Sequence, residues 1–208
     1  MITPILFLHG WGGNADSFAP ISRYFARERQ VLTPTLPCPP DTVYTLEDYA
    51  NAVLKYLQQH DVTQCAVVAH SFGARLVAVL NAKQPTLFTK IVITGGAGLP
   101  PRRTLARWWR LRQRRKQGGS PEYRDLTPNG KKTFQNIVNR DLTPEIGQIT
   151  APTLIINGER DDATPLSMAK RWHRLVKGSQ LKVYRGCGHF AYLDRASQFI
   201  QDVRQWLN

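Results

Sequence analysis

The sequence is poor in cysteine and in acidic residues, and it contains no long hydrophobic run. It has three cysteines, Cys38, Cys65 and Cys187, and their spacing matches no metal-binding pattern. An odd and sparse set of cysteines favours a reduced, cytoplasmic setting over a disulfide framework. No apolar stretch approaches the roughly 20 residues that a membrane-spanning helix needs. We therefore expect neither a disulfide-rich nor a membrane-spanning protein.

The first residues also lack the features of a secretion signal. The stretch "MITPILFLHGWGG" has no basic region and no small-residue cleavage site, so we interpret it as a strand and a loop. Hydrophobic residues make up 42% of the chain and charged residues 21%, which is typical of a soluble globular protein. The length of 208 residues suits a single domain.

Positive charge is abundant and unevenly distributed. The net charge is +13, and residues 97–150 hold 12 Lys and Arg against 4 Asp and Glu, which accounts for +8 of it. A charge concentrated in one segment bears on partners and solubility more than on the fold.

Apolar runs that end at glycine or polar residues alternate with helical patterns along the chain. The runs predict six strands, at residues 4–10, 30–36, 64–70, 90–96, 152–159 and 181–186. The helical patterns lie at residues 15–28, 45–60, 71–84, 164–176 and 196–207, with Thr45 and Asp48 as a capping pair. This alternation predicts an α/β fold, with a mostly parallel six-stranded sheet and helices on both faces. Pro34 indicates that the second strand lies at an edge.

Residues 97–150 interrupt this alternation, because they contain no good strand. We interpret them as a basic insertion over the sheet, and residues 1–96 and 151–208 as the core.

Polar residues of three kinds follow three of the predicted strands. Ser71 follows the third strand, Asp161 and Asp162 follow the fifth, and His189 follows the sixth. A parallel sheet would bring all of them to one edge, where such sheets bind ligands. A serine hydroxyl is a weak nucleophile that needs a base, and the base needs an orienting carboxylate.

Four segments carry a resemblance to a known family: "HGWGG", "AHSFGAR", "NGERDDATP" and "GCGHFAYLD", in that order. Together they resemble the α/β-hydrolase superfamily, and the chain looks most like its small bacterial serine hydrolases and carboxylesterases. The resemblance covers nearly the whole chain. It implies an α/β-hydrolase fold with a short helical lid at 97–150.

The resemblance implies that Ser71 is the nucleophile. The family's turn is Gly-x-Ser-x-Gly, and here Ala69 and Gly73 take the glycine positions, so Ala69 departs from the pattern by one methyl group. The alternative is that Ser71 only caps the following helix.

Among the five histidines we expect His189 to be the base, since it follows a strand end in a loop that must bend. His70, next to Ser71 at a sharp turn, is interpreted as a wall residue. The resemblance implies that His9 braces its loop, whereas His60 and His173 fall on helices and are expected at the surface.

The family pattern Gly-x-x-Asp-x-x-x-Pro, with Gly158 and Pro165, places the acid at Asp161. Asp162 remains the alternative. The resemblance also implies an oxyanion hole made by the backbone N–H groups of Trp11 and Phe72. Members of the superfamily that cleave epoxides or haloalkanes use aspartate as the nucleophile, so Ser71 disfavours both activities.

The segment at 102–117, "RRTLARWWRLRQRRKQ", places Trp108 and Trp109 among arginines. One interpretation is a lid helix whose aromatic side covers the acyl pocket and whose basic side associates weakly with an anionic membrane surface or substrate. The other is a solvated basic helix with its tryptophans packed on the core. We expect no nucleic-acid partner, because no recognised nucleic-acid-binding motif accompanies the arginines.

The sequence thus predicts a serine hydrolase that cleaves small-molecule carboxylic esters through an acyl-enzyme, with no metal or organic cofactor. Two alternatives stay open. One is hydrolysis of carbon–carbon bonds in dienones on the same three residues, and the other is a non-catalytic binding protein on a hydrolase fold.

Overall fold

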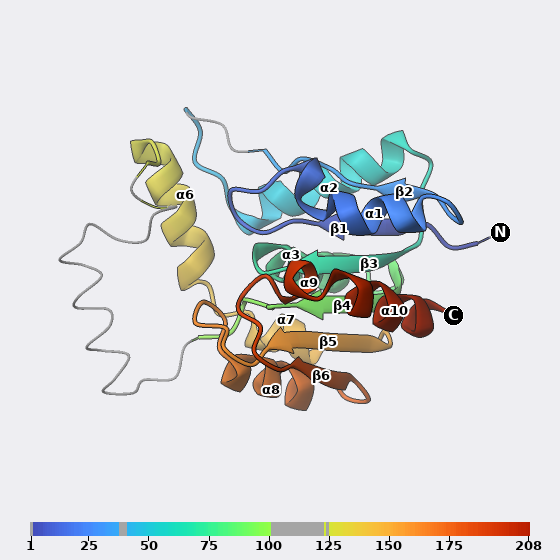
Figure 1. The fold of residues 1–208 in the computed structure, drawn as a ribbon. Helices are drawn as coiled ribbons and strands as arrows, with labels where there is room; N and C mark the ends of the chain where they lie inside the picture. Colours follow the sequence, from blue (N-terminus) through green and yellow to red (C-terminus); the bar gives the residue numbers. More distant parts are fainter. Residues whose placement is uncertain (1, 38–40, 101–122, 124) are drawn as a thin grey trace.

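A six-stranded parallel sheet forms the centre of the protein (Figure 1). The structure is a computed structural model that describes residues 2–37, 41–100, 123 and 125–208. The strands follow the spatial order β2-β1-β3-β4-β5-β6. Their bounds are Ile5–Leu8 (β1), Val31–Leu32 (β2), Cys65–His70 (β3), Phe88–Thr94 (β4), Thr153–Gly158 (β5) and Gln180–Tyr184 (β6). The predicted α/β fold and six-stranded sheet are confirmed, and every pair of neighbouring strands is parallel.

Helices cover both faces of the sheet, because successive strand residues point to opposite sides. In β1, Leu6 and Leu8 belong to one hydrophobic cluster, whereas Ile5 and Phe7 belong to the other. The first cluster packs against α2 (Leu46–Gln59), α3 (Phe72–Lys83), α7 (Thr143–Gly147) and α8 (Leu166–Leu175). The second packs against α1 (Ala19–Phe25), α9 (Ala191–Asp194) and α10 (Ala196–Leu207).

Caps set where the helices begin. At the start of α2, the Thr45 side chain accepts from the Asp48 N–H and the Asp48 carboxylate accepts from the Thr45 N–H, as the capping pair predicts. The predicted helix at 15–28 is instead a 3-10 helix, η1 (Ala15–Phe18), followed by α1. Asn14 and Ser17 form a capping box for η1, and Pro20 lies in the first turn of α1. The capping box belongs to η1 alone, and α1 begins at Ala19 without a side-chain cap.

The second strand is much shorter than the predicted 30–36. It pairs with β1 only at Val31 and Leu32, at the edge of the sheet. Beyond them, Pro34 has no N–H to donate to a ladder, and the Leu36 N–H donates to His9 Nε2 at 3.0 Å. The chain therefore leaves the sheet to brace the loop after β1.

The described part of residues 97–150 contains helices α6 (Pro128–Asn139) and α7 and no strand. Leu142, Ile146 and Ile149 are buried in the same cluster as α3 and α8, so α7 packs as part of the core. The segment 102–117 lies outside the described residues. The lid, and the division into 1–96 with 151–208 and 97–150, stay predictions.

Within the part of the chain that the structure describes, no helix is both long and apolar enough to cross a membrane.

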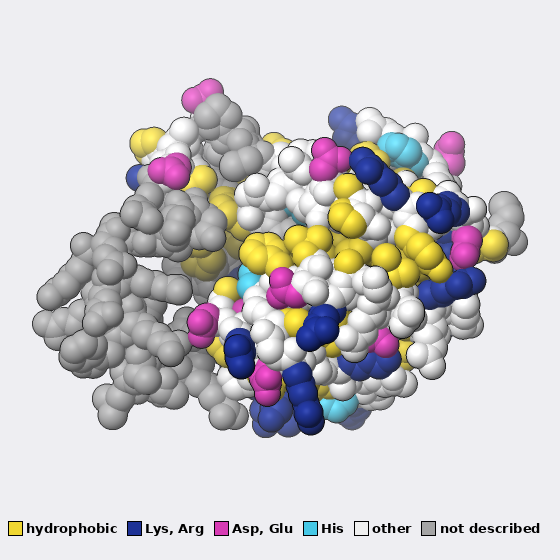
Figure 2. Space-filling model, viewed as in Figure 1, with side chains coloured by type: hydrophobic (Ala, Val, Ile, Leu, Met, Phe, Trp, Pro, Cys, Tyr) yellow, Lys and Arg dark blue, Asp and Glu magenta, His cyan; other side chains and the backbone are white. Residues whose placement is uncertain are grey.

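Cys65 and Cys187 are free and buried, and burial raises the pKa of the Cys65 thiol to about 12. Over the described part of the face in Figure 2, Lys and Arg side chains alternate with Asp and Glu. The cytoplasmic location stays a prediction.

Candidate active site

Ser71 occupies a strained turn between β3 and α3. Its backbone has φ 51° and ψ −106°, and a positive φ costs a non-glycine residue about 1–3 kcal/mol. Backbone hydrogen bonds connect the turn to the end of β4 and the residues after it: the Ser71 N–H donates to Thr94 O at 3.1 Å, and Ser71 O accepts from the Ala97 N–H at 3.2 Å. The Ser71 side chain makes no capping hydrogen bond to α3, so the interpretation of Ser71 as only a helix cap is wrong.

The small residues beside Ser71 allow α3 to approach the sheet closely. A Cβ on Gly73 would lie 2.3 Å from Leu8 O, which only glycine avoids. Ala69, in the other glycine position of the expected turn, is fully buried within β3. The turn therefore needs glycine after the serine and tolerates a methyl group before it.

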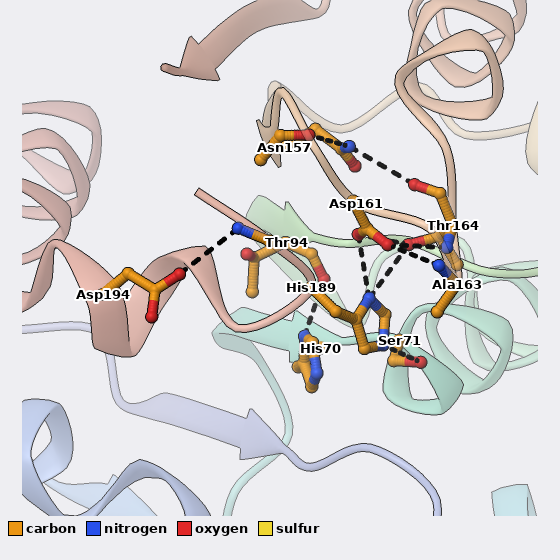
Figure 3. A network of polar contacts seen from close by, with 11 residues as sticks. His70, Ser71, Thr94, Asn157, Asp161, Ala163, Thr164, His189 and Asp194 are labelled. Atoms are coloured by element: carbon orange, nitrogen blue, oxygen red, sulfur yellow. Dashed lines mark hydrogen bonds and ion pairs between the residues drawn. The ribbon is translucent and has the colours of Figure 1, made fainter. Parts of the chain in front are cut away.

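His189 lies between Ser71 and Asp161 (Figure 3). Its Nε2 is 3.1 Å from Ser71 Oγ, and its Nδ1 is 2.8 Å from Asp161 Oδ2. Because an ionised carboxylate only accepts, Nδ1 donates to Asp161, and Nε2 of the neutral ring is free to accept the hydroxyl proton of Ser71. The structure thus brings together the three residues that the sequence places after three different strands.

Asp161 is buried and fully hydrogen-bonded. Its Oδ1 accepts from the N–H groups of Ala163 at 2.9 Å and Thr164 at 2.8 Å, and its Oδ2 accepts from Thr164 Oγ1 at 2.8 Å as well as from His189. Burial disfavours the charged form, but the hydrogen bonds from His189 and Thr164 outweigh it and lower the pKa of Asp161. Asp162 is exposed. The contact with His189 therefore belongs to Asp161, as the family pattern implies.

His70 forms a buried wall beside His189. The two rings lie 4.6 Å apart, and His70 Nδ1 donates to Thr94 O at 3.1 Å. Burial, and next the nearby His189, lower the pKa of His70 to about 3, so its ring is neutral at ordinary pH. This agrees with the expected packing role.

The remaining histidines lie close to where the sequence places them, although His60 follows α2 as its C-terminal cap and is not part of the helix. His9 Nε2 accepts from the Leu36 N–H, so Nδ1 carries the proton and donates to Gly10 O at 2.7 Å. Burial lowers the pKa of His9, which keeps this arrangement neutral. His60 and His173 are exposed.

Trp11 and Phe72 lie beside each other at the site, with ring centroids 5.5 Å apart in an edge-to-face arrangement. A Cβ on Gly10 would lie 3.0 Å from His70 Cδ2 and 3.5 Å from Ser71 Cβ, so the loop after β1 passes directly by the serine. Neither the Trp11 nor the Phe72 N–H has a hydrogen-bond partner among the described residues. That these two donors form an oxyanion hole stays a prediction.

Sequence reasoning missed two residues of this site. Thr164 donates to Asp161 and also lies with Oγ1 3.3 Å from His189 Nδ1. Gly95 has φ +56°, and a Cβ there would lie 3.2 Å from His189 Cε1 and Nδ1 and 3.3 Å from Asp161 Oδ2. The pair of glycines that ends the predicted strand 90–96 was the available signal for Gly95. No pattern in the sequence indicates Thr164.

Among residues 2–37, 41–100, 123 and 125–208, no group of three or more His, Cys, Asp or Glu side chains could hold a metal ion. The chemistry available to the described side chains is proton transfer between Ser71 and His189, with the ring oriented by Asp161. That the protein uses no cofactor stays an expectation.

A parallel six-stranded sheet with a serine at a strained strand-to-helix turn, followed by an acid and a histidine after later strands, defines a protein of the α/β-hydrolase class. The model of the alpha/beta hydrolase family matches residues 5–202, and the chain belongs to that family.

Curated relatives with several activities resemble parts of the chain. A proline iminopeptidase of Lactobacillus acidophilus is 30% identical over 103 residues, which is 49% of this chain and 35% of that protein. A 2-hydroxy-6-oxononadienedioate/2-hydroxy-6-oxononatrienedioate hydrolase of Klebsiella pneumoniae is 40% identical over 67 residues, which is 32% of this chain and 23% of that protein. The matched segments thus span well under half the length of either relative.

Solved structures extend the likeness of fold to the whole chain. An esterase from Exiguobacterium antarcticum has a TM-score of 0.82 and 20% sequence identity, and the match covers 99% of this chain and 91% of that one. At this level of identity the likeness concerns the fold alone.

Proposed function

We propose that the protein is a serine hydrolase that cleaves carboxylic esters of small molecules. The observation that carries the proposal is the continuous hydrogen-bond chain from Ser71 Oγ to His189 Nε2, at 3.1 Å, and from His189 Nδ1 to Asp161 Oδ2, at 2.8 Å. It supports the roles of nucleophile for Ser71, of base and then acid for His189, and of orienting carboxylate for Asp161.

The first half of the reaction forms an acyl-enzyme. Ser71 Oγ attacks the ester carbonyl carbon while its proton passes to His189 Nε2, and the carbonyl oxygen becomes an oxyanion. The carbon–oxygen bond to the alcohol then breaks, and the alcohol leaves with the proton from His189. Asp161 stabilises the imidazolium between these two steps, and its lowered pKa keeps it charged for that purpose.

The second half releases the acid. A water molecule gives a proton to His189 Nε2 and attacks the acyl carbon, and the bond to Ser71 Oγ breaks as the proton returns to that oxygen. In both halves the oxyanion needs donors placed in advance, and loss of one such donor typically slows a reaction about 10²–10³-fold. The unpartnered N–H groups of Trp11 and Phe72, within the described part of the chain, support this role.

A second candidate is hydrolysis of a carbon–carbon bond in a dienone, with the same three residues. The observation that favours it is the identity of 40% over 67 residues to the Klebsiella hydrolase. Because both reactions would use the same three residues, turnover of a dienone is the deciding measurement.

The test begins with a fluorophosphonate probe, which labels an activated serine. The parent protein should label and Ser71→Ala should not. A parent protein that does not label contradicts the proposal and favours a non-catalytic binding protein.

A substrate panel then separates the activities. It contains p-nitrophenyl esters from acetate to octanoate, a dienone, and an N-terminal prolyl arylamide prompted by the iminopeptidase relative. We expect the esters to be cleaved fastest, and Ser71→Ala to lose several orders of magnitude in rate while its circular dichroism is unchanged. A mutant that keeps more than about a tenth of the parent rate would direct the search to another nucleophile.

A further inference from the structure

Arg75 is a buried cation that lies four residues after Ser71, in the first turns of α3. Only 7% of its surface is exposed. One terminal nitrogen of its guanidinium donates to Ile137 O at 2.7 Å and to Arg140 O at 3.1 Å, and the other donates to Val138 O at 3.4 Å. Arg75 therefore joins the helix that carries the candidate nucleophile to the carboxyl end of α6.

The partners of Arg75 explain how a charge can be buried there. Burial lowers the pKa of Arg75 to about 10, so the side chain remains charged at neutral pH. Among the described residues it forms no salt bridge with a carboxylate. Its partners are instead carbonyl groups at the end of α6, which lack helical partners of their own and carry the negative end of the helix dipole. The contact thus gives the buried cation hydrogen-bond acceptors and gives the carbonyl groups at the helix end a donor.

α6 brings an aromatic side chain to the candidate site. The Phe134 ring on α6 lies 5.3 Å from the Trp11 ring, and the Trp11 ring lies 5.5 Å from the ring of Phe72. Near the middle of α6, Thr133 Oγ1 accepts from the Tyr44 N–H at 2.9 Å. The position of α6 thus sets where Phe134 meets the residue whose N–H we assign to the oxyanion.

We propose that Arg75 is a positioning residue that fixes the carboxyl end of α6, so that Phe134 forms an apolar wall for the acyl chain of the substrate. Arg75 acts through α6 and touches neither the substrate nor the reacting atoms. The part of the proposal that concerns acyl chains rests on the proposed ester hydrolysis. The part that concerns α6 rests on the hydrogen bonds of Arg75 alone.

A second cation at the same helix end provides a matched control. The Arg140 side chain forms ion pairs with Glu47 and with Glu145, the latter at 2.9 Å, but these side chains are partly exposed. Exposed ion pairs contribute little because water screens them. The Arg140 carbonyl would still accept from Arg75 in an Arg140→Met variant.

The kinetic experiment compares Arg75→Met, Arg75→Lys and Arg140→Met on p-nitrophenyl acetate and octanoate. For Arg75→Met we expect KM for octanoate to rise about tenfold, the size of effect that follows loss of hydrogen bonds to a charged group, with kcat for acetate within about twofold of the parent. Arg75→Lys, which keeps a charged donor, should lie between the parent and Arg75→Met. Arg140→Met should resemble the parent on both esters.

A double mutant tests whether Arg75 acts through Phe134. If it does, adding Arg75→Met to Phe134→Ala should raise KM for octanoate little further, because the wall is already removed. Fully additive effects, or an equal loss on both esters, would overturn the proposed link to the acyl chain.

Hydrogen exchange tests the positioning of α6 without any substrate. In Arg75→Met the amides of α6 should exchange about tenfold faster or more, while those of β3 and β4 stay protected. Unchanged exchange in α6 overturns the inference whatever the activity of the protein. Faster exchange in α6, together with a parent that cleaves no ester, leaves the positioning by Arg75 standing and shows that the proposed function has failed.

Discussion

The carbonyl oxygen of Gly188 lies where a side chain on Gly158 would have to be. A Cβ built on Gly158 would be 2.1 Å from Gly188 O and 2.5 Å from Cys187 O. Gly158 ends β5, and Gly188 precedes His189, so the missing side chain allows the histidine loop to lie directly against the end of the strand that leads to Asp161. The approach of two loops that are 30 positions apart in the chain thus depends on one glycine.

This contact predicts that Gly158→Ala displaces His189 and impairs both activity and stability. We expect kcat/KM for an ester to fall about 10²-fold, since a shift of about 1 Å in a reacting group has that effect. Ester turnover and urea unfolding are the measurements. Gly147→Ala is the control, because a Cβ there meets no atom within 4 Å. Equal behaviour of the two variants would show that the close approach is unimportant.

The two neighbouring aspartates should differ sharply in their effect on catalysis. Asp161→Asn would present an amide N–H₂ to His189 Nδ1 and favour the wrong tautomer, so we expect kcat to fall about 10⁴-fold. Asp162→Asn should leave it within about threefold, since that side chain is exposed. Steady-state kinetics with thermal melts as a folding control decide the matter. The reverse ranking would assign the acid to Asp162.

The low pKa of His70 predicts a pH dependence of stability. In the folded protein the pKa is about 3, whereas the ordinary value is 6.5, so between these values the unfolded chain binds more protons. The free energy of unfolding therefore rises with pH across this window, by about 1 kcal/mol per pH unit for a single such group. Burial lowers the pKa of His9 as well, which adds a contribution of the same sign.

Urea unfolding at several pH values between 4 and 7 measures this dependence. A His70→Gln variant should be less stable than the parent at pH 7 but should lose less stability on acidification. His60→Gln, at an exposed histidine, is the matched substitution measured beside it. A His70→Gln slope equal to that of the parent would contradict the prediction.

The basic segment 102–117, which lies outside the described residues, is predicted to affect surface attraction and not the chemistry. Replacing Arg110, Arg112, Arg114 and Arg115 with glutamine should leave turnover of a short neutral ester within about threefold. It should weaken binding to anionic vesicles, and added salt should do the same to the parent, since the field is screened over roughly 8 Å at physiological ionic strength. Co-sedimentation at two salt concentrations measures both. A parent that does not sediment at low salt would favour the solvated basic helix.

Local patterns predicted the order of strands and helices well and their ends less well. The strand predicted at 64–70 is found at Cys65–His70, only one residue shorter. It could be predicted because a continuous apolar run is typical of a strand that is buried on both faces. The strand predicted at 30–36 keeps only Val31 and Leu32. The Leu36 N–H finds its partner on His9, 27 positions away, and such a distant contact leaves no local pattern.

The sequence by itself determined the α/β architecture and indicated Ser71, Asp161 and His189 as the candidate catalytic residues. Hydrophobic periodicity sets which faces are buried, and the carboxyl ends of parallel strands must meet at one edge. Only the tertiary structure decided that His189 lies 3.1 Å from a serine 118 positions away, that Thr164 holds the acid, and that Arg75 binds the end of α6. A hydrogen bond requires a distance and a direction between two atoms, and these are set by the packing of the whole chain around them.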